Sequence, residues 1–283
     1  MANRLFRVSA NTLGLRYCEN DGRRLSACLA THYGFDVIEP EPRYGTILEA
    51  FAGFLDGCAK TDTAIVHFSG HGVRLGGRLF FQLTDDSSKH ASRIDLNQLV
   101  RDFQDCAAGH RLVILDCCHA SHAAKIAWPE HSDRYLVLVA SRTGDTAREA
   151  EDLEGGLLTT FLVDLLANPP HSAIADDGQI HIRGLFPDLH QRTKDYLAAH
   201  PQGAGDSLPD LIGNETIRIP IGAPPTSHPA KVLSLIREFR GANLAKLKAQ
   251  CPELTESQFN AALDKLKSEG RVVVAYNIPT IIA

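Results

Sequence analysis

Two short apolar runs that end abruptly in small and polar residues constrain the fold of this chain most. They are VHFSGHG, residues 66–72, and RLVILDCCHAS, residues 111–121. Runs of this length and composition are typical of buried strands in a parallel sheet. Because working side chains of open α/β sheets gather at the carboxyl ends of strands, the pattern predicts that His71 lies near Cys117 and Cys118.

The segments around these two runs alternate between strand and helix patterns. Further strands are predicted at residues 4–9, 35–38, 135–140 and 216–219, and a short edge hairpin after the glycines that follow residue 72. Amphipathic helices are predicted at residues 20–31, 44–58, 94–103, 157–166 and 185–199. This alternation predicts a doubly wound α/β fold with a mostly parallel sheet.

The composition changes near residue 222 and divides the chain into two predicted domains. GAPPTSHP, residues 222–229, has the composition of a linker and follows a large α/β domain, residues 1–221. Residues 230–283 carry helical spacing three times and then two short strand patterns, which resembles a small α+β winged-helix domain.

The net charge also differs between the two predicted domains. Residues 228–283 hold 8 Lys and Arg against 5 Asp and Glu, whereas residues 1–227 hold 21 against 29. A net charge of −5 over 283 residues predicts no affinity of the whole molecule for nucleic acid or membranes. No apolar stretch approaches the roughly 20 residues that a membrane helix needs, and the seven cysteines form no CxxC pair. We therefore expect a protein of the reducing cytoplasm.

A cysteine and a histidine at adjacent strand ends predict thiol catalysis. A thiol is a weak nucleophile at neutral pH, and an imidazole such as that of His71 activates it by accepting its proton. The oxyanion formed on a substrate carbonyl needs backbone N–H donors, and the amides of Gly72 and Cys118 are the candidates. Asp116 places a carboxylate two residues before Cys118.

The remaining cysteines and histidines are interpreted as structural or solvent-exposed. Single cysteines in apolar surroundings are usually inert core residues. A zinc site built from Cys117, Cys118, His119 and His122 has poor tetrahedral geometry, because adjacent cysteines cannot easily bind one ion and no second ligand pair follows. We therefore expect no metal site.

HFSGHG and LDCCHAS together resemble the histidine and cysteine motifs of the caspase-like peptidases. The separation of 47 residues between His71 and Cys118 agrees with the roughly 50 residues typical of caspases. The resemblance covers residues 1 to about 221 and is strongest to the metacaspases and their bacterial relatives, the orthocaspases. It implies a caspase-like three-layer sandwich in which Cys118, directly before a histidine, is the nucleophile and Cys117 is not.

The metacaspase pattern also implies a specificity pocket for the substrate. Its residues match Cys18, Asp21, Ser69 and Asp116. Two carboxylates without a basic neighbour predict cleavage after arginine or lysine. The calcium-binding aspartates of metacaspases cannot be located, so no cofactor is expected and calcium activation is unsupported. Only residues 119–133 separate Cys118 from the next strand region, which argues against release of an intersubunit linker.

These features predict a cysteine endopeptidase that acts on protein substrates. The resemblance implies a bacterial defence or cell-death effector, whose C-terminal module binds a protein partner or an upstream activator. Two alternatives remain: a catalytically inactive caspase-fold scaffold, and a regulator whose winged helix binds DNA while the large domain senses a signal. The intact His71 and Cys118 argue against the first. The weak basic charge of the C-terminal module argues against the second and makes nucleic-acid binding an unfavoured prediction.

Overall fold

The chain forms two compact units, Met1–Pro224 and Pro225–Ala283, and the predicted linker spans the division between them. A computed structural model describes residues 3–12, 14–83, 93–120, 135–140, 149–201, 208–224, 232, 235–236, 239–251, 254, 256–268, 270, 272–275 and 277–281.

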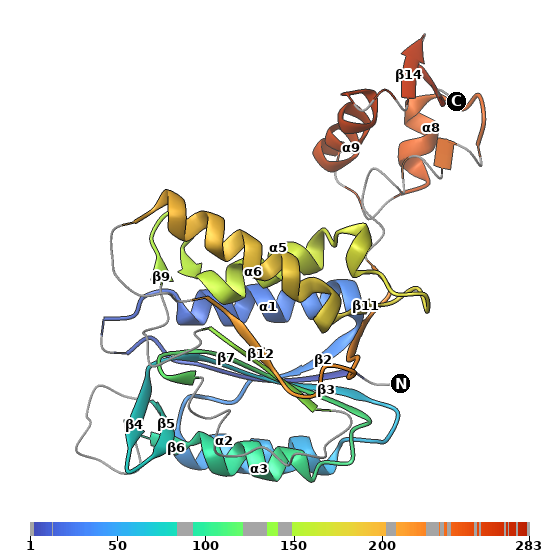
Figure 1. Cartoon of the computed structure of the whole chain (residues 1–283). Helices are drawn as coiled ribbons and strands as arrows, with labels where there is room; N and C mark the ends of the chain where they lie inside the picture. The colour runs from blue at the N-terminus through green and yellow to red at the C-terminus, as the bar shows by residue number, and fades with distance from the viewer. Residues whose placement is uncertain are drawn as a thin grey trace. The chain divides into compact units, whose positions relative to one another are not determined.

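A six-stranded sheet forms the centre of the first unit (Figure 1). Its strands lie in the order β12-β8-β7-β3-β1-β2. All neighbours pair in parallel except β12, which is antiparallel to β8. The strands are β1 (Asn3–Ser9), β2 (Phe35–Ile38), β3 (Thr63–Gly70), β7 (His110–Cys117), β8 (Tyr135–Val139) and β12 (Asp210–Ile212).

Helices cover both faces of this sheet and make three layers (Figure 1). On one face lie α2 (Tyr44–Asp56) and α3 (Leu96–Gln104), and on the other lie α1 (Cys18–Tyr33), α5 (Leu157–Ala167) and α6 (Ile182–Ala199). Each face has its own core of buried side chains. The predicted α/β sandwich with a mostly parallel sheet is therefore confirmed.

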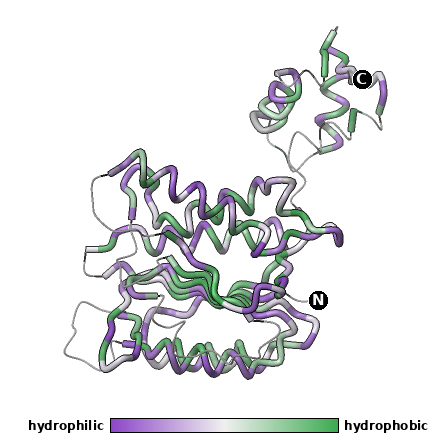
Figure 2. Tube along the Cα trace, viewed as in Figure 1, coloured by the Kyte–Doolittle hydropathy of each residue, from purple (hydrophilic) through white to green (hydrophobic). Residues whose placement is uncertain are grey.

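The most apolar part of the first unit is the middle of the sheet, between the two helical layers (Figure 2). Every residue of β3 is buried, and so is every residue of β7 from Leu112 onward. Strands covered on both faces need continuous apolar runs rather than alternation. This is the reason that VHFSGHG and RLVILDCC were recognisable as strands.

Several short strands surround the carboxyl edge of the sheet and complete the first unit. After β3 the chain forms a three-stranded antiparallel sheet of β4 (Gly72–Leu75), β5 (Arg78–Gln82) and β6 (Arg93–Asp95). β9 (Glu149–Ala150) pairs with β10 (Gly155–Gly156) just before α5. Away from this edge, β11 (Ile180–His181) pairs with β13 (Pro220–Gly222), and η2 (His171–Ala173) is a short 3-10 turn.

The predicted strand at residues 216–219 is wrong. The side chain of Asn214 accepts hydrogen bonds from the Thr216 amide and hydroxyl, both at 2.9 Å, which turns the chain there. Ile217 and Ile219 are nonetheless buried. The alternation of apolar and polar residues here therefore reflects burial of every second side chain and not hydrogen bonding to a neighbouring strand. The helix predicted to start at residue 94 begins at Leu96, because the Asp95 carboxylate caps its first amides.

The second unit has its own buried core. Its described elements are α8 (Leu244–Ala249), α9 (Glu256–Ser268) and an antiparallel hairpin of β14 (Val272–Ala275) and β15 (Ile278–Ile281). Helices followed by a hairpin agree with the predicted order, while the likeness to a winged helix stays a prediction. Across all the residues described in both units, no helix is long and apolar enough to cross a membrane.

Candidate active site

The predicted histidine and cysteine leave the sheet side by side. β3 and β7 pair in parallel, and the last matched pair of residues is Gly70 opposite Cys117. The residues that directly follow these two strands, His71 after β3 and Cys118 after β7, therefore lie at the same edge of the sheet. Two residues 47 positions apart in the sequence reach one place because the two strands end level with each other.

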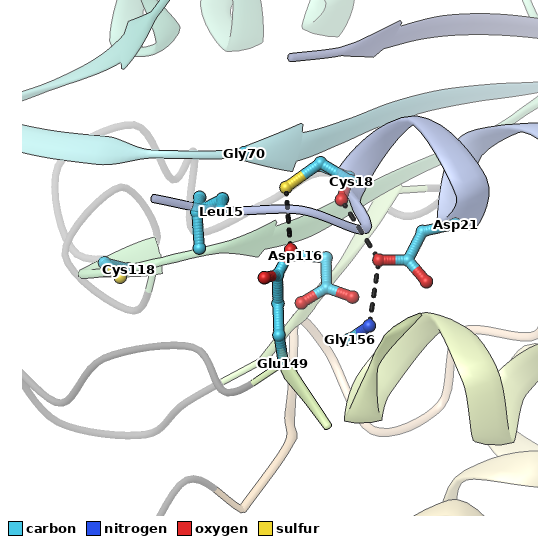
Figure 3. A pocket seen from close by; sticks show the side chains of 9 residues that line it. Leu15, Cys18, Asp21, Gly70, Asp116, Cys118, Glu149 and Gly156 are labelled. Carbon is cyan, nitrogen blue, oxygen red and sulfur yellow. Dashed lines mark hydrogen bonds between the residues drawn. The ribbon is translucent and has the colours of Figure 1, made fainter. Parts of the chain in front are cut away.

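The two adjacent cysteines have different surroundings. Cys117 is fully buried and packs into the core on the side of α2 and α3. Cys118 lines a pocket at the strand end, and Figure 3 shows its side chain facing that space. Successive residues of a strand face opposite sides, which explains the difference. Burial raises the pKa of the Cys117 thiol well above its ordinary value, and the neighbouring Cys118 adds to this.

A sharp turn follows Cys118. His119 has a backbone φ of 60°, in the left-handed region that non-glycine residues rarely adopt. Such conformations are held by their surroundings and are frequent at functional sites. The turn leads the chain away from the sheet directly after the candidate nucleophile.

His71 is half-buried, and its backbone carbonyl accepts a hydrogen bond of 2.9 Å from the Gln82 amide. This bond ties the loop to β5. Burial lowers the pKa of the imidazole, and the neighbouring His119 lowers it further. A histidine with a lowered pKa is neutral at pH 7, the state in which it can accept a proton.

Gly72 and Cys118 touch through their backbones. A Cβ atom added to Gly72 would overlap the carbonyl oxygen of Cys118, so only glycine fits. The structure thus brings together the two residues whose amides were predicted to form an oxyanion hole. Cys118 lines the pocket, and His71 directly follows Gly70, another lining residue.

The pocket contains all four residues predicted to bind substrate (Figure 3). They come from β3, β7 and the first turn of α1, and they meet where the carboxyl ends of the strands face the start of that helix. The pocket is lined by Leu15, Cys18, Asp21, Ser69, Gly70, Asp116, Cys118, Glu149 and Gly156.

Hydrogen bonds hold Asp21 at the pocket. Its Oδ2 accepts from the Gly156 amide at 2.9 Å and from the Ser69 hydroxyl at 3.5 Å. Its Oδ1 is buried and accepts no hydrogen bond from the part of the chain that the structure describes. Burial raises the pKa of Asp21 to about 8, and Asp116 adds to the rise, while the Gly156 amide and the Arg24 guanidinium oppose it. The prediction that these carboxylates have no basic neighbour is therefore wrong for Asp21.

Asp116 is held from the start of α5. Its Oδ2 accepts two hydrogen bonds from Thr159, at 2.7 Å from the hydroxyl and 3.1 Å from the amide. Burial raises its pKa to about 6, although these two bonds oppose the rise. A Cβ on Gly156 would lie 2.5 Å from Asp116 Oδ2 and 3.1 Å from Asp21 Oδ2, so both carboxylates flank this glycine.

Glu149 is a third carboxylate of the pocket that the sequence analysis missed. Its side chain accepts hydrogen bonds at 2.9 Å from the amides of Arg16 and Tyr17, just before α1. It also accepts from the Cys18 thiol at 3.4 Å (Figure 3). Burial and then Glu149 raise the pKa of Cys18, which keeps this cysteine a thiol. In the sequence Glu149 is one of several acidic residues in a single loop, and no signal there distinguishes it.

The model of the caspase domain family matches residues 2–206. The chain belongs to this family. The chain is 32% identical to Metacaspase-4 of Arabidopsis thaliana over an aligned length of 126 positions, which covers 38% of this chain and 29% of the plant protein. The crystal structure of Caspase-1 from Spodoptera frugiperda has the same fold, with a TM-score of 0.56 at 15% identity over 78% of this chain and 89% of that one.

The caspase-like resemblance inferred from HFSGHG and LDCCHAS is thus confirmed, and it places the chain in a family of cysteine peptidases. Among the side chains that the structure describes, no three of His, Cys, Asp or Glu are arranged to hold a metal ion. The expectation that no metal or other cofactor is needed stays a prediction. The predicted absence of a released linker concerns residues that lie outside the described part of the chain.

Proposed function

We propose that this caspase domain is a cysteine endopeptidase that cleaves protein substrates after arginine or lysine. One observation carries the proposal: Cys118 lines the same pocket as the carboxylates of Asp21, Asp116 and Glu149. A nucleophile beside a buried acidic pocket suits a peptide whose cationic side chain enters the pocket and places the next carbonyl at the sulfur.

The reaction uses two residues and two amides. His71 accepts the proton of Cys118, and the thiolate attacks the carbonyl carbon of the scissile bond. The negative charge that develops on the carbonyl oxygen is stabilised by the amides of Gly72 and Cys118, and one such donor is typically worth about 3 to 4 kcal/mol. His71 then gives the proton to the leaving amine. Water, with His71 as base, releases the acid product and restores the thiol.

Charge sets the specificity. The guanidinium of arginine has a planar fork that can donate two hydrogen bonds to one carboxylate, whereas lysine offers a point charge. Asp21 Oδ2 and Asp116 Oδ2, which flank Gly156 at the pocket, are the acceptors that such a donor would reach. An acidic side chain in this pocket would face like charges at close range. Arginine is therefore the preferred residue and aspartate is rejected.

The wider role follows from the family and the composition. We place the enzyme in the cytoplasm, as an effector of bacterial defence or cell death, working as one chain without a cofactor. The second unit binds a protein partner or an upstream activator and not nucleic acid, because its acidic and basic residues nearly balance. This balance also disfavours the alternative of a DNA-binding regulator.

The test is a panel of fluorogenic peptides that differ only in the residue before the scissile bond. Purified full-length enzyme should cut arginyl peptides fastest, lysyl peptides more slowly and aspartyl peptides not measurably. Cys118→Ala is the inactive control. Equal rates on arginyl and aspartyl peptides would contradict the pocket assignment. If the folded protein cleaves none of the peptides, the alternative of a catalytically inactive scaffold is favoured.

A further inference from the structure

Two turns lie side by side at the edge of the sheet opposite the pocket. β3 and β7 begin level with each other, Thr63 opposite His110, so the turns that precede them are adjacent. The His110 amide donates a hydrogen bond of 3.1 Å to the Asp62 carbonyl and joins the two turns. One turn follows α2 and carries Cys58, and the other follows α3 and carries Cys106.

The two cysteines belong to one buried cluster, in which the Phe54 and Phe103 rings that precede them lie 6.0 Å apart. The Cys58 thiol is within hydrogen-bonding reach of the Cys106 sulfur, and also of the Phe54 carbonyl oxygen at 3.2 Å. Each residue retains 8% of its surface exposed, whereas Cys117 and Cys251 retain none. Both residues are therefore buried, but less completely than Cys117 and Cys251.

The surroundings favour a thiolate on Cys106. The hydrogen bond from Cys58 lowers the pKa of Cys106 to about 7 against the effect of burial. The Ala108 amide, which donates to the sulfur at 3.3 Å, and the Arg111 guanidinium also lower it. The thiolate is the nucleophilic form of cysteine, and cysteines near basic residues are the ones that react with oxidants.

We propose that Cys58 and Cys106 form a dithiol site that a small hydroperoxide oxidises to a disulfide. The Cys106 thiolate attacks one peroxide oxygen, the O–O bond breaks, and the products are Cys106 sulfenic acid and water or an alcohol. The Cys58 thiol then attacks the sulfenic sulfur, the new S–S bond forms, and water leaves. Two thiols together lose two electrons and two protons, and the peroxide is the oxidant that accepts them.

The disulfide would join the turns after α2 and α3 and close a loop of the chain between residues 58 and 106. Constraining the unfolded chain in this way stabilises the folded state. The bond would form at the amino end of β7, and Cys118 follows the carboxyl end of the same strand. Oxidation of the dithiol site therefore stabilises the first unit without consuming the nucleophile.

The test uses the full-length chain with Cys118→Ala, which removes the other candidate reactive thiol. After treatment with stoichiometric hydrogen peroxide, remaining thiols are blocked with N-ethylmaleimide and peptides are mapped without reduction. We expect a cross-linked peptide pair joining Cys58 to Cys106, two hydrogens lighter than the reduced peptides and separated again by dithiothreitol. The melting temperature of the oxidised protein should rise by about 5 to 10 °C.

Single substitutions in the Cys118→Ala protein show which cysteine attacks the peroxide and which one then forms the disulfide. With Cys58→Ser, dimedone should trap a sulfenic acid on Cys106, whereas with Cys106→Ser it should leave Cys58 unlabelled. Cys28→Ser is the matched control, because Cys28 has a similar exposure and a pKa that burial raises to about 11, and it should not change the disulfide yield. Maleimide on both Cys58 and Cys106 after peroxide treatment would overturn the proposal, whether or not either serine variant folds. Dimedone on Cys58 and not on Cys106 would also overturn it.

Discussion

The two ends of β7 place cysteines in opposite electrostatic environments. At the carboxyl end, Cys18 lies among the buried carboxylates of the pocket, where burial and Glu149 raise its pKa. At the amino end, Cys106 lies beside Cys58 and Arg111, and its pKa is lowered although it is also buried. Both ends are brought into contact with β3 by one parallel register.

The difference shows that burial alone does not decide whether a cysteine is inert. Burial raises the thiol pKa at both ends, and the neighbouring groups decide the result. Carboxylates add to the effect of burial at the pocket, while at the opposite edge a thiol donor, an amide and a guanidinium overcome both burial and the Asp62 carboxylate. At the pocket, the same carboxylates that keep Cys18 a thiol are available to bind a cation.

The largest expected effect separates the two adjacent cysteines of the carboxyl end. Cys118→Ala or His71→Ala should lower kcat/KM for an arginyl peptide at least about a thousandfold, because each removes a member of a unit that acts together. Cys117→Ala should retain most of the activity, since Cys117 packs in the core. Steady-state kinetics measure kcat/KM for each variant, and circular dichroism checks that each variant is folded. Full activity in Cys118→Ala would contradict the assignment of Cys118 as the nucleophile.

A second substitution tests the charge of the pocket. Asp116→Asn should reduce the preference for arginyl over neutral peptides by a hundredfold or more, because a buried cation that loses its partner typically costs about 3 to 5 kcal/mol. The ratio of kcat/KM values for matched peptides gives the preference. Asp56→Asn, at the exposed end of α2, is the control and should change nothing. An unchanged preference in folded Asp116→Asn would mean that Asp116 serves only to anchor α5.

A third prediction concerns pH. Because the pKa values of Asp21 and Asp116 are raised, to about 8 and about 6, the empty pocket binds protons at neutral pH and below. A guanidinium binds best to ionised carboxylates, so KM for an arginyl peptide should fall as pH rises from about 6 to about 8.

His71 does not produce the upper part of this change in KM, since its pKa is lowered from its ordinary value of 6.5. Asp21→Asn should remove the upper part of the pH dependence. A KM that is flat between these pH values in the parent enzyme would show that the carboxylates are ionised before substrate binds.

The smallest expected effect comes from Thr159, whose side chain positions Asp116. Thr159→Val removes the hydroxyl donor at 2.7 Å and leaves the amide donor at 3.1 Å. Hydrogen bonds to charged groups contribute about 1.5 to 3 kcal/mol, so KM for arginyl peptides should rise roughly tenfold to a hundredfold with little change in kcat. Thr159→Ser should restore the parent KM. A drop in kcat without a change in KM would indicate that Thr159 acts elsewhere.

Much of the fold was predictable because its signals are local. β2 was predicted to the residue, and α5 begins at the predicted Leu157. These segments carry their periodicity within a few residues. The strand predicted at residues 216–219 is wrong because the Asn214 side chain holds the chain in a turn there. An alternating pattern shows that one side of a segment is buried, and it does not show that the segment hydrogen-bonds to a neighbouring strand.

The sequence by itself determined the strand runs, the polar residues that end them and the family motifs around His71 and Cys118. Tertiary structure alone decided which carboxylates share the pocket, because Glu149 reaches it only after β9 folds against the start of α1. It also decided that Cys58 and Cys106, both interpreted from sequence as inert core residues, lie in one buried cluster on adjacent turns. The physical reason is the same in both cases: contacts between residues far apart in the chain depend on how strands are ordered and how their ends align, and no local pattern carries that information.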